Sequence, residues 1–511
     1  MKAGDFNFDL LVVGKGLSGM MAAIVAEEAG LSVALVSESD DSASSWAQGG
    51  IVYKDADSKN SDLLQEDILN AGAQLNSHEI VKMITECGSE YIEEFLIKKA
   101  KIHFDQNEAG DFDLGQEAAH SKRRILHVKD QTGLAILSAL KKYVQQSKKI
   151  SEFNGALIDL ISSDRHSVEK QAVYSEHSIQ GAYFLDSKDE VFSVLTSATI
   201  LASGGYTGIF QYCTGPKNNI GAGIAAAHRA GAKTMHMEFV QFHPTVLYAD
   251  EAPRGLLTEA LRGEGALLLN DRGERFVDEL APRDQVSRAI HYQIAESSKR
   301  YVSLDLRNVK NLKKKFPGIY KKITEYSLDP LKDLVPVVPA AHYSLGGIWV
   351  NENGKTSVPN LWACGEVSCS GLHGANRLAS MSLVEALVFG VRSARDALRA
   401  LEKKEIFESP FTVKKWKDAT HEVDPILLKQ DWLLLRQSMW NYVGLVRSEK
   451  RLNRAQKLLV ELRSQVDSFY QETKLNRSLL SLRHSVLVST LCLFSALSRK
   501  ESLGTHFIEK E

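Results

Sequence analysis

An arginine inside a glycine-rich turn is the first candidate for chemistry in this sequence. The stretch Gly371-Leu372-His373-Gly374-Ala375-Asn376-Arg377 is followed by an apolar helix that is predicted to begin near Ser382. Arginine carries a planar fork of donors that matches a carboxylate with two hydrogen bonds. The free N–H groups at the start of the helix would face an electron-rich ligand atom. A structural turn with a surface arginine is the alternative for any single stretch of this kind.

A nucleotide-binding pattern lies at the N-terminus. A short apolar strand, Asp9–Val13, runs directly into a glycine-rich turn, and a helix-forming stretch, Met20–Ala29, follows. The glycines allow the tight turn, and a pyrophosphate can then reach the helix N-terminus. A second strand over 33–36 leads to Glu38, at the distance where a ribose-binding side chain is expected. The turn residues are Gly14, Lys15, Gly16, Leu17, Ser18 and Gly19.

A group of polar motifs between residues 236 and 344 supplies candidate anion ligands. The side chains are two histidines, an arginine, a threonine and a glutamine, all of which can donate hydrogen bonds to carboxylate oxygens. Each one alone is more often a structural residue. Together with Arg377 they predict a site for an anionic substrate. They are Gln241, His243, Thr258, Arg283 and His342.

Composition narrows the classes of function. The chain has 511 residues and a formal net charge of -2, so no general basic field favours nucleic acid as a partner. The five cysteines form no C-x-x-C pair, and we expect neither a metal site nor a disulfide framework. No secretory signal pattern stands at the N-terminus. The most apolar C-terminal run, 486–497, is expected to be too short and too polar to span a membrane. A cytoplasmic protein is the simplest expectation.

The order of patterns along the chain predicts how these residues are positioned. Alternating strands and helices in the first third predict a doubly wound α/β sheet. Short apolar pieces over 156–158 and 182–185 suggest a small antiparallel sheet. We predict a nucleotide-binding domain over 1–235 that resumes over 345–401, with a capping domain inserted over 236–344. Residues 402–511 form a linker that contains Pro410 and then a helical domain.

The joint appearance of these motifs resembles the fumarate reductase and succinate dehydrogenase flavoprotein family. Ala47-Gln48-Gly49-Gly50, after the second strand, belongs to the same pattern. The resemblance covers essentially the whole chain. It implies an α/β fold: a doubly wound FAD-binding domain with an inserted α+β capping domain and a C-terminal helical bundle.

By this resemblance, FAD is the cofactor, and several further segments line it. Respiratory members of the family attach FAD covalently through a histidine, but Ala43 stands at that position, so the resemblance implies non-covalent FAD. Glu366 would bind a sugar or ribityl hydroxyl, and the N–H groups of Ser382 and Leu383 would face the flavin ring. The remaining cofactor residues implied are Glu38, Ala43, Ser44, Ser45, Trp46, Ala47, Gln48, Gly49, Gly50, Ala156 and Leu157.

The resemblance also assigns roles to the polar residues. Arg377 and His342 would hold one substrate carboxylate, and His243 and Thr258 the other, with Gln241 nearby. Arg283 matches the acid/base arginine of the family. Because arginine is normally always protonated, proton transfer through it requires a local relay.

One segment points to the aspartate-oxidising members of the family. Residues 116–127 match a segment that places a glutamate beside the substrate amino group, so Glu117 takes that role by resemblance. A dicarboxylate without an amine has no use for an added carboxylate, which would repel it. L-Aspartate would be oxidised to iminoaspartate, with dioxygen or fumarate as the electron acceptor. Quinolinate synthase would take the product toward NAD.

Two other functions remain open at this point. A soluble fumarate reductase is disfavoured by Glu117, and a degenerate flavin-binding scaffold is disfavoured by the intact set of anion ligands. The sequence departs from the family pattern at Ala222, where an aspartate is usual, and at Met381, where an asparagine is usual. These departures bear on the affinity for FAD more than on the type of reaction.

Overall fold

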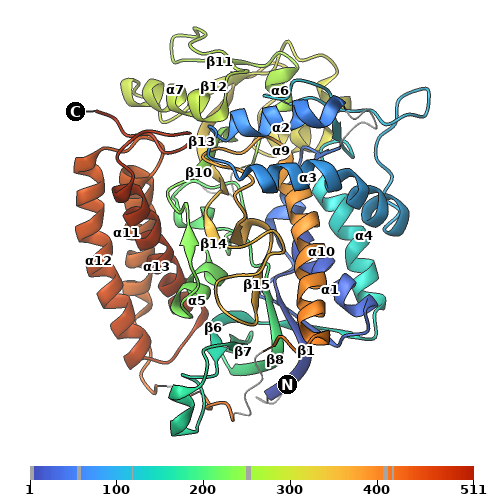
Figure 1. Cartoon of the computed structure of the whole chain (residues 1–511). Coiled ribbons are helices and arrows are strands. Elements are labelled where there is room, and N and C mark those ends of the chain that lie inside the picture. Colours follow the sequence, from blue (N-terminus) through green and yellow to red (C-terminus); the bar gives the residue numbers. More distant parts are fainter. Residues whose placement is uncertain are drawn as a thin grey trace.

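The fold is taken from a computed structural model, which describes residues 5–53, 59–117, 119–248, 255–406, 412–416 and 419–510. A central seven-stranded sheet forms the base of the molecule, with a second sheet above it and a helical bundle at one side (Figure 1). Pro410, in the predicted linker, lies outside the described residues.

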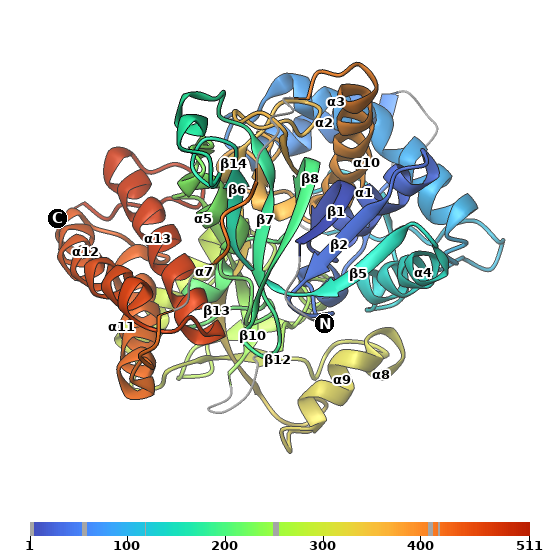
Figure 2. The ribbon, with the colours of Figure 1, turned by 90° about the horizontal axis from the view of Figure 1, so that it is seen from below.

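The central sheet has the strand order β5-β2-β1-β8-β7-β6, and β15 also pairs with β8 (Figure 2). The pairs β5-β2, β2-β1, β1-β8 and β8-β15 are parallel, as expected for a doubly wound domain. The pairs β6-β7 and β7-β8 are antiparallel. The strands are β1 (Asp5–Val13), β2 (Val33–Ser37), β5 (Ile150–Asn154), β6 (Ala156–Ser162), β7 (Ile179–Leu185), β8 (Val191–Leu201) and β15 (Leu361–Ala363).

Two apolar helices cover one face of this sheet. They come from the two parts of the chain, before and after the second sheet, that build the first domain. Helix α1 (Leu17–Glu28) packs against α10 (Met381–Glu402), although more than 350 residues separate their starts. Both are buried over most of their length, because they lie between the sheet and an outer layer of helices. The outer layer contains α2 (Lys59–Ala71), α3 (His78–Tyr91), the π-helix η2 (Ile92–Lys99) and α4 (Thr132–Gln146).

The second sheet is antiparallel and has its own hydrophobic core. Its strand order is β10-β13-β12-β11, and the helices α6, α7, α8 and α9 flank it. All of these elements fall within the predicted inserted segment 236–344, whose boundaries remain a prediction. They are β10 (Val240–Leu247), α6 (Ala260–Gly263), β11 (Leu267–Leu269), α7 (Arg283–Glu296), β12 (Val302–Asp305), α8 (Leu312–Lys315), α9 (Pro317–Thr324) and β13 (Val335–Ser344).

Short elements join the two sheets. Strands β9, β14 and β16 form a three-stranded sheet, and β3 pairs with β4. Helix α5 lies between the central sheet and the bundle. The bounds are β3 (Ile51–Val52), β4 (Ile125–Leu126), α5 (Ala222–Arg229), β9 (Thr234–Met235), β14 (Gly347–Trp349) and β16 (Ser368–Cys369).

Three long helices form the C-terminal bundle: α11 (Pro425–Val443), α12 (Glu449–Glu472) and α13 (Arg477–Ser498). Helix α13 begins well before the apolar run 486–497. Among the described helices it is the one long and apolar enough to cross a membrane, so the expectation that this run is too short and too polar was wrong. However, 72% of that apolar window is buried inside the molecule, which is typical of the core helix of a bundle.

The antiparallel strands of the first domain also differ from expectation. The sequence suggested a small antiparallel sheet over residues 151–203, and β6, β7 and β8 do pair in antiparallel fashion. In the structure β6 and β7 extend the central sheet instead, because the long strand β8 pairs with β1 along one edge and with β7 and then β15 along the other.

Candidate active site

One large cavity runs from the glycine-rich turn after β1 to the start of α10 and on to the second sheet. All of the predicted site residues line it except Leu17, Gly19, Ser45, Ala156 and Gln241. Leu17 and Gly19 are buried inside α1, where they support the turn. The sequence therefore predicted residues that the fold brings together from the two sheets and from α10.

The glycine-rich turn is shaped for close approach of the backbone. Gly14 has a φ of +117°, and a Cβ there would lie 2.1 Å from the carbonyl oxygen of Ala202. A Cβ at Gly19 would lie 2.0 Å from the carbonyl oxygen of Gly14. A side chain at either position is thus excluded. The N-cap residue of α1 is Gly16, which has no side chain to cap the helix, and Oγ of Ser44 accepts the N–H of Leu17 at 3.3 Å.

Other groups in the cavity fit a flavin nucleotide. The buried Oε1 of Gln48 has no hydrogen-bond partner among the described residues. Helix α10 begins after Ser380 without a side-chain cap, which leaves the N–H groups of Ser382 and Leu383 at the cavity wall. Ala43 lies in a short 3₁₀ helix and offers no imidazole for a covalent link. The residues present therefore fit FAD held without a covalent bond.

Some predicted cofactor residues have protein partners. Lys15 forms an ion pair with Glu152 at 2.6 Å and another with Asp40 at 3.3 Å. Burial raises the pKa of Glu38, and Arg477 of α13 opposes this from 3.6 Å. Glu366 accepts hydrogen bonds from the backbone N–H and the hydroxyl of Ser344, at 3.0 and 2.9 Å.

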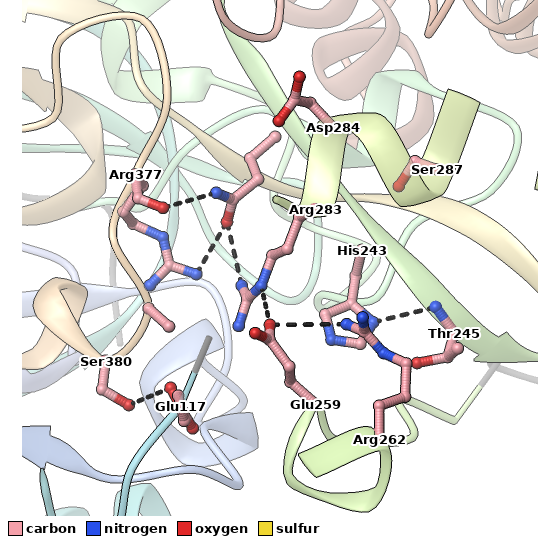
Figure 3. A network of polar contacts seen from close by, with 12 residues as sticks. Glu117, His243, Thr245, Glu259, Arg262, Arg283, Asp284, Ser287, Arg377 and Ser380 are labelled. Atoms are coloured by element: carbon pink, nitrogen blue, oxygen red, sulfur yellow. Dashed lines mark hydrogen bonds and ion pairs between the residues drawn. The ribbon is translucent and has the colours of Figure 1, made fainter. Parts of the chain in front are cut away.

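The guanidinium groups of Arg377, which is buried, and Arg283, which is part-buried, share one glutamine at the end of the cavity (Figure 3). The Oε1 of Gln241 accepts from Arg283 Nη1 and from Arg377 Nη2, both at 3.1 Å. Its Nε2 donates to the carbonyl oxygen of Arg377 at 2.9 Å, and Arg377 also stacks on the ring of Tyr343. Burial, and then the charge of Arg283, lower the pKa of Arg377 to about 10. An anion placed between these groups would relieve their repulsion.

Arg283 is joined to a second arginine through a buried carboxylate. Its Nε donates to Oε2 of Glu259, and Nη2 of Arg262 lies 3.6 Å from the same oxygen. The side chains of Glu259 and Arg262 are 3% and 0% exposed, so this chain is protected from bulk water. An acid/base role for Arg283 would require a local partner of this kind.

Two neutral histidines line the same cavity. Their rings are 5.2 Å apart, and burial lowers the pKa of both well below 6.5, with further lowering by Arg283 at His243 and by Arg377 at His342. The Nδ1 of His243 accepts the backbone N–H of Thr245 at 3.3 Å, which leaves its Nε2–H free to donate. His342 Nδ1 contacts the hydroxyl of Thr214 at 2.8 Å.

Glu117 completes the site from a loop of the first domain. Its Oε2 accepts the hydroxyl proton of Ser380 at 2.8 Å (Figure 3). Burial, and then the charge of Glu259, raise the pKa of Glu117, whereas Arg283, Ser380 and Arg377 act in the other direction. The arrangement places one carboxylate beside a group of cationic and neutral donors.

Comparisons with known proteins agree with this geometry. Residues 9–383 match the family model of the FAD binding domain, and residues 433–510 match that of the fumarate reductase flavoprotein C-terminus. An L-aspartate oxidase of Acinetobacter baylyi is 37% identical over 516 residues, which cover 98% of this chain and 93% of that protein. One of Pseudomonas aeruginosa is 38% identical over 524 residues, with 98% and 95% covered.

The chain belongs to the L-aspartate oxidase family.

Within the wider group of flavoproteins, the fold is shared with a solved structure of E. coli quinol fumarate reductase. That structure is 24% identical, with a TM-score of 0.86, and the match covers 99% of this chain and 92% of that one. FAD is the cofactor of the family, and the glycine-rich turn, Gln48 and the start of α10 are where this chain would hold it.

Some residues of the site were not predicted from the sequence. Glu259 was given no role, although it lies next to Thr258 in the chain. Ser380, Thr214 and Tyr343 were not assigned either. A signal existed only for Glu259, because an acid/base arginine needs a buried partner and this carboxylate adjoins a predicted substrate ligand.

Proposed function

We propose that this chain oxidises L-aspartate to iminoaspartate, the first step of NAD biosynthesis. The observation that carries the proposal is the pair of guanidinium groups of Arg283 and Arg377 on Gln241, in one cavity with two neutral histidines and Glu117. Such a group suits a small dicarboxylate that carries one amino group. The relatives named L-aspartate oxidase cover almost the whole chain and support the same conclusion.

Each part of the substrate has a partner in this proposal. Arg377 and His342 hold one carboxylate, where the planar guanidinium can make two parallel hydrogen bonds. His243 and Thr258 hold the other. Glu117 takes the α-ammonium and orients Cα toward the cofactor. Gln241 does not line the cavity and acts by holding the two arginines in place.

FAD, when bound, supplies the two-electron acceptor for the Cα–H bond. The chain contributes position and proton movement. In the direction of fumarate reduction, Arg283 would deliver a proton to the substrate carbon and recover it from Glu259, with Arg262 behind it. Because this chain of groups is buried, the proton does not exchange directly with water at the reacting carbon.

The finer assignments belong to the proposal as well. Dioxygen or fumarate serves as the final electron acceptor, and quinolinate synthase is the pathway partner that consumes iminoaspartate. The chain acts in the cytoplasm. FAD is bound without a covalent link, because Ala43 stands where a histidine would be needed.

Release of hydrogen peroxide tests the proposed activity. Protein supplemented with FAD should release peroxide on addition of L-aspartate and should not do so on addition of succinate, which lacks the amino group. Reduction of fumarate by a reduced dye is measured alongside. Fumarate reduction without any oxidation of L-aspartate would instead identify a soluble fumarate reductase, and absence of both activities would favour a flavin-binding scaffold.

The mode of FAD binding gives a separate prediction. After acid precipitation, the flavin should appear in the supernatant and not in the washed pellet, as measured by absorbance. Added FAD should also increase activity, because Ala222 and Met381 depart from the usual pattern at the cavity and at the start of α10. Flavin that stays in the pellet would contradict the non-covalent assignment.

A further inference from the structure

We propose that Ser380 is a positioning residue that sets the preference for an amino dicarboxylate, by keeping Glu117 oriented and ionised. The inference rests on the proposed function and deepens it. Its basis is a set of contacts that join the start of α10, the Gly49-Gly50 turn and the loop that carries Glu117. Ser380 stands 263 positions from Glu117 in the chain and touches it directly.

The direction of the Ser380 hydroxyl proton is fixed by its two partners. The backbone N–H of Gly50 donates to Ser380 Oγ at 3.3 Å, and Ser380 Oγ lies 2.8 Å from Glu117 Oε2. Because an N–H can only donate, the hydroxyl accepts on that side and directs its own proton to the carboxylate. This bond favours the charged form of Glu117, against the effects of burial and of Glu259.

The second oxygen of Glu117 is confined by glycine. A Cβ at Gly49 would lie 2.6 Å from Glu117 Oε1, so the carboxylate rests against bare backbone at this position. The carboxylate therefore has one hydrogen-bonded oxygen and one closely packed oxygen. Only a limited range of orientations is left to it, and these face Arg283 and Arg377 within the same cavity.

The loop backbone is tied to the same point by His120. The N–H of His120 donates to the carbonyl oxygen of Glu117 at 3.2 Å, and its ring Nε2 lies 3.0 Å from the carbonyl oxygen of Ala379. Burial lowers the pKa of His120, so the ring is neutral and its Nε2–H donates to that carbonyl. Contacts with residues 379–380 therefore hold the side chain of Glu117 directly and its backbone through His120.

The backbone of Ser380 provides a matched pair of variants. Ser380 has a φ of +57°, a conformation that glycine adopts freely and alanine does not. Ser380→Ala removes the hydroxyl and keeps the Cβ, so the backbone preference of the wild type is retained. Ser380→Gly removes the hydroxyl and the Cβ together, which also changes the freedom of the backbone. A loss caused by the hydroxyl appears in both variants, whereas a loss caused by the backbone appears in Ser380→Gly alone.

The test compares kcat/KM for oxidation of L-aspartate with kcat/KM for reduction of fumarate, in protein saturated with FAD. We expect Ser380→Ala and Ser380→Gly each to lower the value for L-aspartate about 10-fold or more relative to that for fumarate, as for loss of a hydrogen bond to a charged group. As the pH is lowered, the variants should also begin to lose activity on L-aspartate at a higher pH than wild type does. The reason is that Glu117 binds a proton more readily without the hydrogen bond from Ser380. Ser393→Ala, a buried serine on the same helix, serves as the control and should keep the wild-type ratio.

Three results would overturn the inference. One is an unchanged ratio and pH profile in Ser380→Ala. Another is a loss confined to Ser380→Gly, which would assign the effect to the backbone. The third is an equal loss with both substrates, which would assign Ser380 to FAD binding or to folding. A wild-type protein that does not oxidise L-aspartate would instead reject the proposed function, and these outcomes are distinguishable because wild type is measured first.

Discussion

Replacement of Arg377 by leucine is expected to abolish both oxidation of L-aspartate and reduction of fumarate. The two substrates share their carboxylates, and Arg377 is the buried group assigned to one of them. Removing one member of a buried charged pair costs about 2–5 kcal/mol, which is roughly a 30- to 5000-fold loss in kcat/KM. The replacement also removes one of the two donors to Oε1 of Gln241. The glutamine that contacts Arg283 is then held less firmly, and so is Arg283.

The measurement is kcat/KM for both reactions with FAD at saturation. Arg272→Leu is the matched control, since Arg272 lies on an exposed turn between β11 and α7 and should be dispensable for both reactions. Melting temperatures of the two variants show whether folding is affected. Retention of either activity above about a tenth of wild type, in folded Arg377→Leu, would show that Arg377 does not hold a substrate carboxylate.

The parts of the fold that follow from local pattern were predictable. Strand β1, the glycine-rich turn and α1 occur as expected, because a short apolar strand followed by closely spaced glycines leaves few other solutions. The helices α11 to α13 were also expected as a group. The attachment of β6 and β7 to the central sheet could not be predicted, since hydrogen bonds between the backbones of neighbouring strands leave little signal in the sequence.

Side chains suited to an anion could be predicted from the sequence, whereas the side chains that position them could not. Arg283, Arg377 and the histidines stand out because buried donors of this kind suit an anion. The bridging role of Gln241 and the contact between Ser380 and Glu117 depend on three-dimensional juxtaposition. Partners that are 136 and 263 positions apart leave no spacing to recognise.

The apolar run 486–497 was judged too short and too polar to span a membrane for a related reason. Polar residues within it, such as Ser489 and Thr490, made the run look less apolar than the helix around it. Both are buried, and the hydroxyl of Thr490 donates to the carbonyl oxygen of Val486 one turn earlier. A hydroxyl that returns its hydrogen bond to its own helix does not end the helix.

Replacement of Glu117 by glutamine is expected to separate the two substrates. L-Aspartate and succinate differ by the α-ammonium alone, so a preference for the amino acid requires a group that senses this charge. A hydrogen bond between charged groups contributes about 1.5–3 kcal/mol, or roughly 10- to 150-fold. Glu117→Gln keeps the shape of the side chain and its contact with Ser380, and it should lower kcat/KM for L-aspartate by that factor.

Reduction of fumarate should respond in the opposite sense to the same change. A carboxylate near a dianionic substrate opposes its binding, and Glu117 also lies close enough to Glu259 for the two charges to repel. Its neutralisation should therefore leave fumarate reduction intact or raise it slightly. Equal losses for both substrates would indicate that Glu117 shapes the loop and does not bind the amino group. No loss for either would place Glu117 outside the reaction altogether, and the preference for L-aspartate would then have to come from the carboxylate ligands.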